Sequence, residues 1–335
     1  MNQTSPPSTR LVDSFGRQVK YARISVTDRC DFRCLYCMSE DMAFLPRSEI
    51  LTLEEIHHVC AALVSLGVDK LRITGGEPLV RNGVVDLMAR IGALEGLREL
   101  VITTNGSRLA RYAADLKRAG VKRINISLDS LDPVRFRTMT RVGDLGDVLN
   151  GIDVALDQGF EKIKINAVIL RNRNHEEVSD LVQFAVAKGI DISFIEEMPL
   201  GIVDGHNRAE EYYSSDDVRR DLERIYELLP SPETTGGPSR YLRVAGTATR
   251  VGFISPHSHN FCGSCNRVRV TAEGRLLLCL GNEHSVDLKQ VLRDGHSPDS
   301  LTETIVAAMA MKPERHQFDI KAQPVIMRHM SATGG

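Results

Sequence analysis

Three cysteines lie within eight residues in the N-terminal part of the chain, in the spacing C-x3-C-x2-C. They are Cys30, Cys34 and Cys37, and they follow shortly after the strand-like run Tyr21–Val26. Three thiolates are one donor short of a tetrahedral zinc site or a four-cysteine iron–sulfur cluster. A 4Fe-4S cluster held by three cysteines would leave one iron open to a small molecule. A zinc site completed by a distant ligand, or three buried cysteines without a metal, are the alternatives.

A second set of three cysteines lies near the C-terminus, in the spacing C-x2-C-x13-C. Cys262, Cys265 and Cys279 combine a CxxC pair before a predicted hairpin with a third thiol from its far strand. This pattern is typical of a metal site. Because His257 and His259 are close in sequence, a Cys/His zinc site remains open beside a second three-cysteine 4Fe-4S cluster.

The run Thr74–Pro78, with the sequence TGGEP, follows a predicted strand. Glycines at the carboxyl end of a barrel strand let the backbone approach a ligand closely. Glu77 offers an acceptor for an ammonium group. A GGEP turn alone is a weak signal, because glycine and proline also simply end strands.

Strand-like and helical segments alternate from Tyr21 to about Glu196, which is the pattern of parallel βα units. Thr52 and Glu55 form a predicted capping box, and Asn174 with Glu177 predicts another helix start. Cys60 lies on the apolar face of the first of these helices and is predicted to be a buried small residue. The predicted strands are Tyr21–Val26, Leu71–Thr74, Leu100–Thr104, Arg123–Leu128, Lys162–Leu170 and Asp191–Glu196.

Polar side chains alternate with apolar ones along these strands. In Arg123–Leu128, for example, Asn125 and Ser127 share the face of Arg123, opposite the aliphatic residues. The same alternation places Arg23, Arg72 and Lys164 on one face of their strands. Because the apolar face should meet the helices, the polar face should line the interior. A cationic interior predicts a polar, anionic ligand.

The remaining segments predict a smaller C-terminal part. A linker helix is predicted with Ser215 as its cap and an apolar stripe of Val218, Leu222, Ile225 and Leu229. Short strands are predicted at Arg240–Val244, Thr247–Ile254, Val268–Thr271 and Leu276–Cys279, with a turn at Glu273-Gly274 and a last helix at about Leu301–Met311.

These elements predict an α/β fold: an incomplete (β/α)6 barrel of the TIM type with a smaller C-terminal α+β lobe closing its open side. We expect a flexible N-terminus at 1–14, the barrel at 15–200, a linker with one helix at 201–238 and an auxiliary cluster domain at 239–335. A length of 335 residues suits a barrel plus a smaller domain.

Composition excludes some partners. The formal net charge of −2 gives no field for nucleic acid, and the sequence contains neither an apolar run for a membrane span nor a signal-peptide pattern. Six of the seven cysteines fall into the two triplets, which favours metal ligation in a reducing cytoplasm over disulfides.

Taken together, several motifs resemble one family. CxxxCxxC, then GGEP, then CxxCNRVRV with a third cysteine in a following strand, and a Gly-Gly end are similar to the GTP 3′,8-cyclases of molybdenum cofactor biosynthesis, within the radical S-adenosylmethionine (SAM) superfamily. The resemblance covers about residues 15–335. It implies two 4Fe-4S clusters, and it leaves His257 and His259 as ordinary loop residues.

The resemblance also assigns residues. Cys30, Cys34 and Cys37 would hold the SAM-cleaving cluster, and Cys262, Cys265 and Cys279 the second. Tyr36, Gly76, Ser127 and Met198 would contact SAM, while Arg23, Arg72, Thr103, Lys164, Arg267 and Arg269 would bind GTP, the last two acting in catalysis as well. Gly334-Gly335 would be an ordered tail that reaches the active site.

The implied reaction is cyclisation of GTP to (8S)-3′,8-cyclo-7,8-dihydro-GTP, after a 5′-deoxyadenosyl radical removes the 3′ hydrogen. Its partners would be an external low-potential electron donor and, through product transfer, cyclic pyranopterin monophosphate synthase; the chain could act as a homodimer. The alternatives are another radical SAM enzyme with an auxiliary cluster, such as a peptide-modifying one, or a non-enzymatic iron–sulfur or zinc module. The NRVR run and the terminal Gly-Gly argue against the first of these, and the six-strand scaffold argues against the second.

Overall fold

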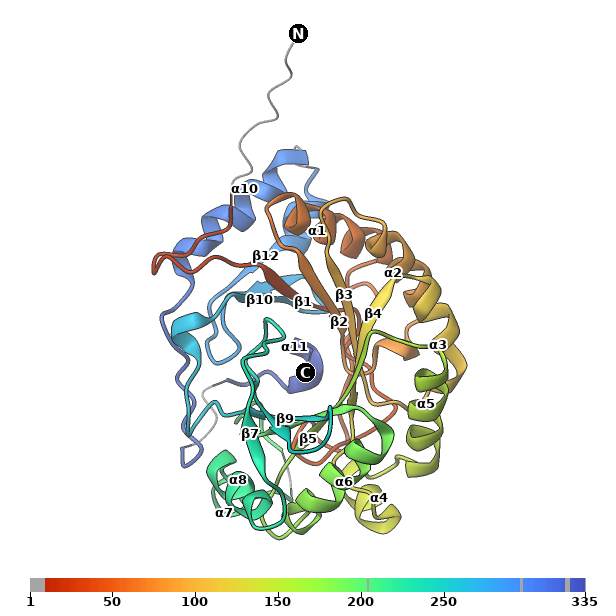
Figure 1. Cartoon of the computed structure of the whole chain (residues 1–335). Helices are drawn as coiled ribbons and strands as arrows, with labels where there is room; N and C mark the ends of the chain where they lie inside the picture. The colour runs from red at the N-terminus through yellow and green to blue at the C-terminus, as the bar shows by residue number, and fades with distance from the viewer. Residues whose placement is uncertain (1–9, 204, 296–297, 323–325, 335) are drawn as a thin grey trace.

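A single curved sheet organises the chain. The computed structural model describes residues 10–203, 205–295, 298–322 and 326–334. In these ranges twelve strands pair in the order β12-β11-β10-β1-β2-β3-β4-β5-β6-β9-β8-β7. Figure 1 shows the strands curving around a central space, with helices on the outside.

The central six strands are parallel and confirm the predicted βα series. They are β1 (Tyr21–Ser25), β2 (Lys70–Thr74), β3 (Glu99–Thr104), β4 (Val121–Ser127), β5 (Lys162–Val168) and β6 (Asp191–Ile195). Their ends differ from the predicted ones by no more than two residues, which is the usual uncertainty of strand boundaries.

The C-terminal part extends this sheet at both edges. β10 (Arg267–Val270) pairs in parallel with β1, and β9 (Arg250–Ile254) pairs in parallel with β6. Antiparallel partners follow on each side: β11 (Arg275–Leu277) and β12 (Ser285–Asp287) beyond β10, and β8 (Arg240–Val244) and β7 (Leu228–Pro230) beyond β9. The C-terminal strands therefore continue the barrel wall on both sides of the six-strand core.

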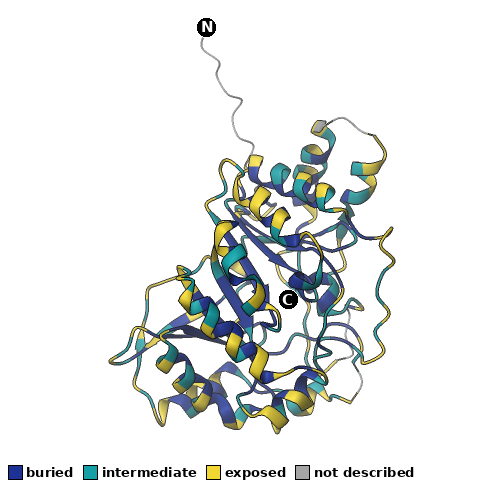
Figure 2. Ribbon diagram, turned by 90° about the vertical axis from the view of Figure 1, so that its right-hand side faces the viewer, coloured by how far each residue is buried: buried dark blue, intermediate teal, exposed yellow. Residues whose placement is uncertain are grey.

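Helices cover the outer face of the sheet. They are α1 (Leu53–Ser65), α2 (Val84–Gly92), α3 (Leu109–Arg118), α4 (Pro133–Thr140), α5 (Leu145–Asp157) and α6 (Val178–Lys188). The predicted capping box at the start of α1 is confirmed, with Thr52 and Glu55 each bonded to the other's backbone N–H. Figure 2 shows the buried inner faces of these helices and their exposed outer faces.

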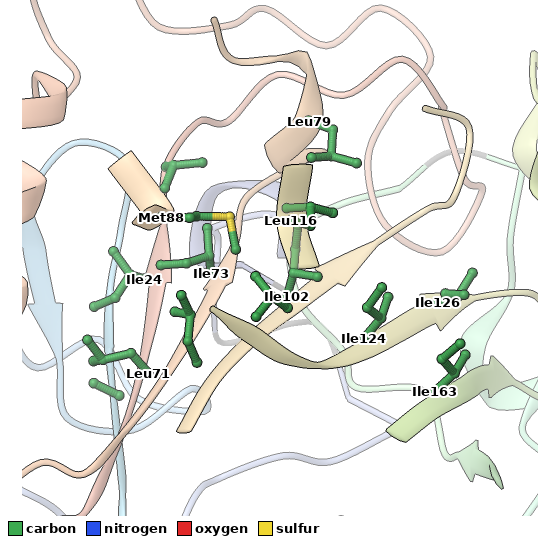
Figure 3. Close-up of a cluster of buried hydrophobic side chains, with 14 of the residues drawn as sticks. Ile24, Leu71, Ile73, Leu79, Met88, Ile102, Leu116, Ile124, Ile126 and Ile163 are labelled. Carbon is green, nitrogen blue, oxygen red and sulfur yellow. The ribbon is translucent and has the colours of Figure 1, made fainter. Parts of the chain in front are cut away.

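The core lies between the sheet and these helices. Ile24, Ile73 and Ile102 project from neighbouring strands toward Met88 and Leu116 of α2 and α3, and all five are buried (Figure 3). The apolar face of the strands thus meets the helices, as the alternation predicts. Cys60 belongs to the same core.

Two helix predictions are wrong in detail. Asn174 makes no cap; its side chain bonds the backbone of Leu170, Asp129 and Val168, and a short 3-10 turn η2 (His175–Glu177) precedes α6. The helix α8 (Ser215–Glu223) is capped by Ser214 and stops before Ile225, which is 64% exposed. Leu229 instead lies in β7, because that segment pairs with β8.

The linker and C-terminal segments add short helices. They are α7 (Arg208–Glu211), α9 (Leu288–Arg293), α10 (Pro298–Ala308), η4 (Met309–Met311) and α11 (Met330–Thr333). α9 and α10 contact α1, whereas α11 lies inside the ring of strands near the C-terminus (Figure 1). In the region expected to be flexible, Leu11 and Asp13 are buried, while 1–9 lie outside the described residues. In the described ranges, no helix has the length and apolarity needed to cross a membrane.

Buried ion pairs join strand starts at the amino end of the barrel. Glu99 Oε2 lies 2.8 Å from Lys70 Nζ, and Glu99 Oε1 lies 3.0 Å from Arg123 Nη1. Across the sheet, Asp191 at the start of β6 accepts hydrogen bonds from the guanidinium and the backbone N–H of Arg250 at the start of β9. This second pair therefore ties the C-terminal edge strand to the six-strand core.

We predict that Asp191→Asn lowers the free energy of unfolding by about 3 kcal/mol, because it leaves a buried guanidinium without its main carboxylate. Both side chains of the pair are only 6% exposed. Urea unfolding of the variant measures the change. Glu233→Gln is the matched control, since Glu233 pairs with the same arginine but is 62% exposed, and its loss should change stability by about 1 kcal/mol or less. Equal effects of the two substitutions would contradict the role given to the buried pair.

Candidate functional site

The first cysteine triplet lies in the loop at the carboxyl end of β1. The loop is held by its own backbone and by the end of α4: Cys37 N donates to Cys34 O at 2.9 Å, and Leu35 N donates to Met139 O at 3.0 Å. Arg33 Nη1 donates to Cys30 O at 2.7 Å. Burial raises the pKa of all three thiols, that of Cys37 to about 12. A positive metal centre would favour the thiolate forms.

The TGGEP turn packs directly against this loop. Gly76 N donates to Thr27 O, and Glu77 N donates to Arg29 O, both at 2.8 Å. A Cβ atom at Gly75 would lie 2.6 Å from Thr27 O, and one at Gly76 would be still closer to Arg29 O. Both positions therefore require glycine for the two loops to approach each other.

Glu77 does not serve as the free acceptor that the sequence suggests. It is buried, and its carboxylate accepts from Leu79 N at 2.9 Å, Thr104 Oγ1 at 2.9 Å and Asn105 N at 2.6 Å. Burial raises its pKa to about 7, although the N–H donors oppose this. Glu77 therefore joins the end of β3 to η1 (Pro78–Val80) and supports the loop instead of facing a ligand.

Residues expected to contact SAM surround the first triplet. Tyr36, Gly76, Ser127 and Met198 line the same cavity as the three cysteines. The hydroxyl of Tyr36 donates to Asp129 Oδ2 at 2.7 Å, and Val168 N donates to Asp129 Oδ1 at 2.8 Å. Burial raises the pKa of Asp129 to about 6. Asp129 thus holds Tyr36 and the backbone of Val168 beside the cavity, and no sequence motif indicated this role.

The second cysteine triplet lies at the other end of the neighbouring strands. Cys262 and Cys265 flank the short turn η3 (Cys262–Ser264) before β10, and Cys279 follows β11, which runs antiparallel to β10. Since β1 and β10 are parallel, the first triplet lies at the carboxyl end of this pair and the second at the amino end. The five residues of β1 span on the order of 15 Å between them.

Electrostatics differ within the second triplet. Burial would raise the pKa of Cys265, but the charges of Arg267 and Lys312 outweigh it, so the pKa is lowered. Burial raises the pKa of Cys279. His257 and His259 bond elsewhere, to Glu197 O and Asp216, as expected of loop residues.

Either cysteine triplet could supply the three thiolates of an iron–sulfur cluster. In the ranges that the structure describes, no three His, Cys, Asp or Glu side chains gather closely enough to hold one metal ion. Each cysteine of a cubane cluster binds a different iron, so the thiolates stay further apart than around one tetrahedral zinc. Both cysteine triplets open onto one cavity.

Cations project inward between the two triplets. Strand register aligns Arg23 with Arg72 of β2 on one side and Arg269 of β10 on the other. Lys164 Nζ lies 3.1 Å from Ser193 Oγ and 3.2 Å from Tyr241 Oη. Burial lowers the pKa of Lys164, that of Arg72 to about 10, and that of Arg269 well below its ordinary range. The interior therefore disfavours unneutralised positive charge and would be stabilised by an anion.

Two buried tyrosines partly offset this charge. Tyr21 is 1% exposed, and its hydroxyl accepts from Arg23 Nε at 3.2 Å while Lys70 and Arg72 lie near its ring. Although burial would raise their pKa values, the nearby cations lower the pKa of Tyr21 and of Tyr241 to about 7. Sequence reasoning missed both. Period-two alternation from Arg23 would have placed Tyr21 on the inner face.

The loop before β8 also reaches the cavity. Thr235, Gly237, Pro238 and Ser239 line it. No sequence motif in this segment indicated a contact with a ligand. Lys70 Nζ donates to Thr235 O at 2.8 Å, which holds the loop against β2. A Cβ at Gly252 would clash with Ser193 and Ser239, so this glycine lets the loop and Tyr241 approach Lys164.

The C-terminal tail enters the ring of strands. Arg269 Nη1 donates to the carbonyls of Thr333 and Gly334, and Ser331 and Thr333 are buried. Gly334 has a φ of +74°, and a Cβ there would overlap Thr74. The expected ordered tail is thus seen as far as Gly334, while Gly335 lies outside the described residues.

The sequence-predicted residues come together in one cavity. Its lining includes all of them: Arg23, Cys30, Cys34, Tyr36, Cys37, Arg72, Gly76, Thr103, Ser127, Lys164, Met198, Cys262, Cys265, Arg267, Arg269 and Cys279. The role of each residue in binding SAM, GTP or a cluster is implied by the resemblance to the cyclase family.

The segment after β6, which carries Met198, is anchored by a buried histidine. His206 Nε2 lies 2.6 Å from Glu197 Oε2, and its Nδ1 lies 2.7 Å from Glu211 Oε2. Arg208 Nε donates to the same Glu197 at 2.8 Å. Burial would lower the pKa of His206, but the two carboxylates outweigh it and raise the pKa.

Comparison with known proteins agrees with this geometry. Residues 24–185 match the radical SAM superfamily, and residues 190–318 match the family described as Molybdenum Cofactor Synthesis C. The chain is 60% identical to GTP 3′,8-cyclase of Pseudomonas entomophila over 97% of this chain and 98% of that relative. It is 56% identical to GTP 3′,8-cyclase of Marinobacter nauticus over 98% of this chain and all of that relative.

Solved structures share the fold at low identity. Streptococcus suis SuiB superposes with a TM-score of 0.60 at 18% identity, covering 82% of this chain and 64% of that one. SuiB bound to S-adenosylmethionine gives a TM-score of 0.59 at 17% identity, and the match covers 91% of this chain and 78% of that one. Identity at this level indicates a common architecture only.

The contacts of His206 predict a pH-dependent contribution to stability. Because the folded pKa is raised, the stabilising protonated form is fully present below the unfolded pKa of about 6.5 and is lost as pH rises through the folded value. His206→Gln should therefore lower the melting temperature most at about pH 6, with a smaller difference at higher pH. His259→Gln, at an exposed pair with Asp216, is the control. A deficit for His206→Gln that is constant from pH 6 to 9 would contradict the assignment.

Proposed function

The chain belongs to the GTP 3′,8-cyclase family of radical SAM enzymes, and from this premise we propose how its residues serve the reaction. The enzyme converts GTP to (8S)-3′,8-cyclo-7,8-dihydro-GTP, the first step of molybdenum cofactor biosynthesis. One observation carries the proposal: the two cysteine triplets open onto one cavity, with inward-facing cations between them.

Cys30, Cys34 and Cys37 would hold the 4Fe-4S cluster at which SAM binds. When bound, cluster and SAM supply a 5′-deoxyadenosyl radical, which removes the hydrogen at C3′ of GTP before C3′ bonds to C8. Gly76 would contact this cofactor through its backbone, and Tyr36, Ser127 and Met198 would orient it. The hydrogen bond to Asp129 fixes the Tyr36 ring.

The inward cations would bind the triphosphate. Arg23, Arg72, Lys164, Arg267 and Arg269, with Thr103, line the space between the triplets. Guanidinium and ammonium groups form charge-assisted hydrogen bonds to phosphate, and fixing the triphosphate holds the ribose in place for hydrogen transfer. Arg267 and Arg269 would act both in binding and in catalysis, because β10 places them between the second triplet and the tail.

Cys262, Cys265 and Cys279 would hold a second 4Fe-4S cluster, which would supply an open iron for the guanine of GTP. The place of these thiols at the amino end of β10, where they line the same cavity as the first triplet, supports this. We further propose a radical SAM barrel at 15–200, a linker at 201–238 and an auxiliary cluster domain at 239–335. Although the strands of both parts form one sheet, the cysteines of the second set all lie in the last range.

The wider setting follows from the chemistry. Reductive cleavage of SAM needs an external low-potential electron donor, and the product would pass to cyclic pyranopterin monophosphate synthase. Thiols kept free for metal binding favour a reducing cytoplasm. The net charge of −2 supports neither a nucleic-acid nor a membrane partner.

We predict that protein reconstituted anaerobically with iron and sulfide holds about eight irons per chain, and that SAM, dithionite and GTP together yield 5′-deoxyadenosine with matching consumption of GTP. Two clusters and a GTP-directed radical require this coupling. Iron is measured colorimetrically, and 5′-deoxyadenosine and GTP are measured by chromatography. SAM cleavage that is indifferent to GTP would exclude the cyclase assignment, whereas about four irons with coupled turnover would exclude only the second cluster.

Lys164→Ala should weaken GTP binding by about 10- to 100-fold, since a charge-assisted hydrogen bond to phosphate contributes about 1.5–3 kcal/mol. The Kd is measured by calorimetry with reconstituted protein and SAM, and the iron content should stay unchanged. Lys162→Ala is the matched control, because Lys162 is the exposed first residue of the same strand. Loss of iron from the Lys164 variant would instead indicate a structural role.

A further inference from the structure

Lys312 is a buried lysine beside the second cysteine triplet, and the reaction as described above does not use it. It is 2% exposed and follows η4 near the end of the chain. Its Nζ donates to Leu278 O at 2.6 Å and to Arg267 O at 3.0 Å, and it lies 3.8 Å from Cys265 Sγ.

These contacts join two of the three cysteine-bearing segments. Leu278 immediately precedes Cys279, so one hydrogen bond fixes the backbone beside that ligand. The contacts to Cys265 Sγ and Arg267 O fix the segment that carries Cys265. One ammonium group therefore sets the position of the CxxC loop relative to the far strand of the hairpin.

Arg17 ties the third segment to the same place. Its Nη1 donates to Cys262 O at 2.8 Å and to Glu314 O at 2.7 Å, and its Nη2 donates to Pro313 O at 2.7 Å. The segment that carries Lys312 is thus bonded, directly or through Arg17, to the surroundings of all three cysteines.

Among the described residues, no carboxylate pairs with the ammonium group of Lys312. In the described part of the chain, the hydrogen bonds of its ammonium go to two carbonyl oxygens and one sulfur. A buried cation is costly unless an opposite charge lies close by. Cys265 Sγ lies 3.8 Å from this ammonium group and would carry negative charge as a thiolate ligand.

We propose that Lys312 is a positioning residue for the second cluster: its ammonium group fixes the Cys265 and Cys279 segments and compensates the negative charge of the bound 4Fe-4S group. This inference rests on the second cluster proposed above. Reduction adds negative charge, and net charge and hydrogen bonds to sulfur set cluster potentials. A neighbouring cation therefore makes the second cluster easier to reduce.

Lys312→Met tests the proposal, because it keeps the length of the side chain and removes the charge. Reconstituted variant and wild type are compared by iron content and by redox titration followed by electron paramagnetic resonance. We expect the midpoint potential of the second cluster to shift to a more negative value while that of the first is unchanged. Loss of about four irons, from the second site alone, would equally support the positioning role.

Two further variants complete the experiment. Lys312→Arg keeps the charge and should shift the potential less than the Met variant; an equal shift would contradict the charge argument. Lys321→Met makes the same substitution at an exposed lysine further along the segment and should change neither iron nor potential.

Three outcomes would overturn the proposal or the assumption on which it rests. If Lys312→Met keeps about eight irons and both wild-type potentials, Lys312 has no role at the cluster and the proposed function stands. If wild-type protein itself holds only about four irons, the second cluster and the inference built on it both fall. Iron lost equally from both sites, with matching loss in Lys312→Arg, would mark a general defect of folding and also exclude the specific role.

Discussion

The pairing of β1 with β10 on one side and β2 on the other is the constraint on which the site depends. It aligns Arg23 with Arg269 and Arg72, and it places the two cysteine triplets at opposite ends of neighbouring parallel strands. A shift of one residue in this register would turn the arginines toward the helices and the aliphatic residues inward. The same pairing makes β10 part of the barrel wall, and the second triplet lies next to this strand.

Electrostatic balance explains the arrangement inside the ring. At the amino end of the barrel, Glu99 neutralises Lys70 and Arg123. Further in, Arg23 and Lys164 contact hydroxyl groups, including those of the two tyrosines whose pKa values are lowered to about 7. The protein therefore keeps its cations available at mid-barrel, where a triphosphate would replace weak partners by strong ones.

Much of this could be predicted from sequence because the signals are local. Period-two alternation found the inward faces of β1, β2, β4 and β5, and cysteine spacing found both triplets. What depends on long-range pairing could not be predicted: the parallel addition of β9 and β10, the approach of Thr235 and Tyr241 to the cavity, and the burial of Lys312 beside Cys265. Local signals also misled where tertiary contacts prevailed. Asn174 and Glu77 have the residue types of a cap and a ligand acceptor, yet both are used to hold neighbouring loops.

The C-terminal tail shows how such a tertiary contact can act on the site itself. Arg269 bonds the carbonyls of Thr333 and Gly334, so the tail occupies part of the hydrogen-bonding capacity of a residue proposed to bind GTP. Gly334 can take this path because glycine tolerates the positive φ and has no side chain that would overlap Thr74. A carbonyl is a weaker partner for a guanidinium than a phosphate oxygen is. A triphosphate that reaches Arg269 must therefore either share it with the tail or displace the tail. Displacement would couple the position of Thr333 and Gly334 to occupation of the cavity, a physical role for this segment that its sequence alone could only suggest.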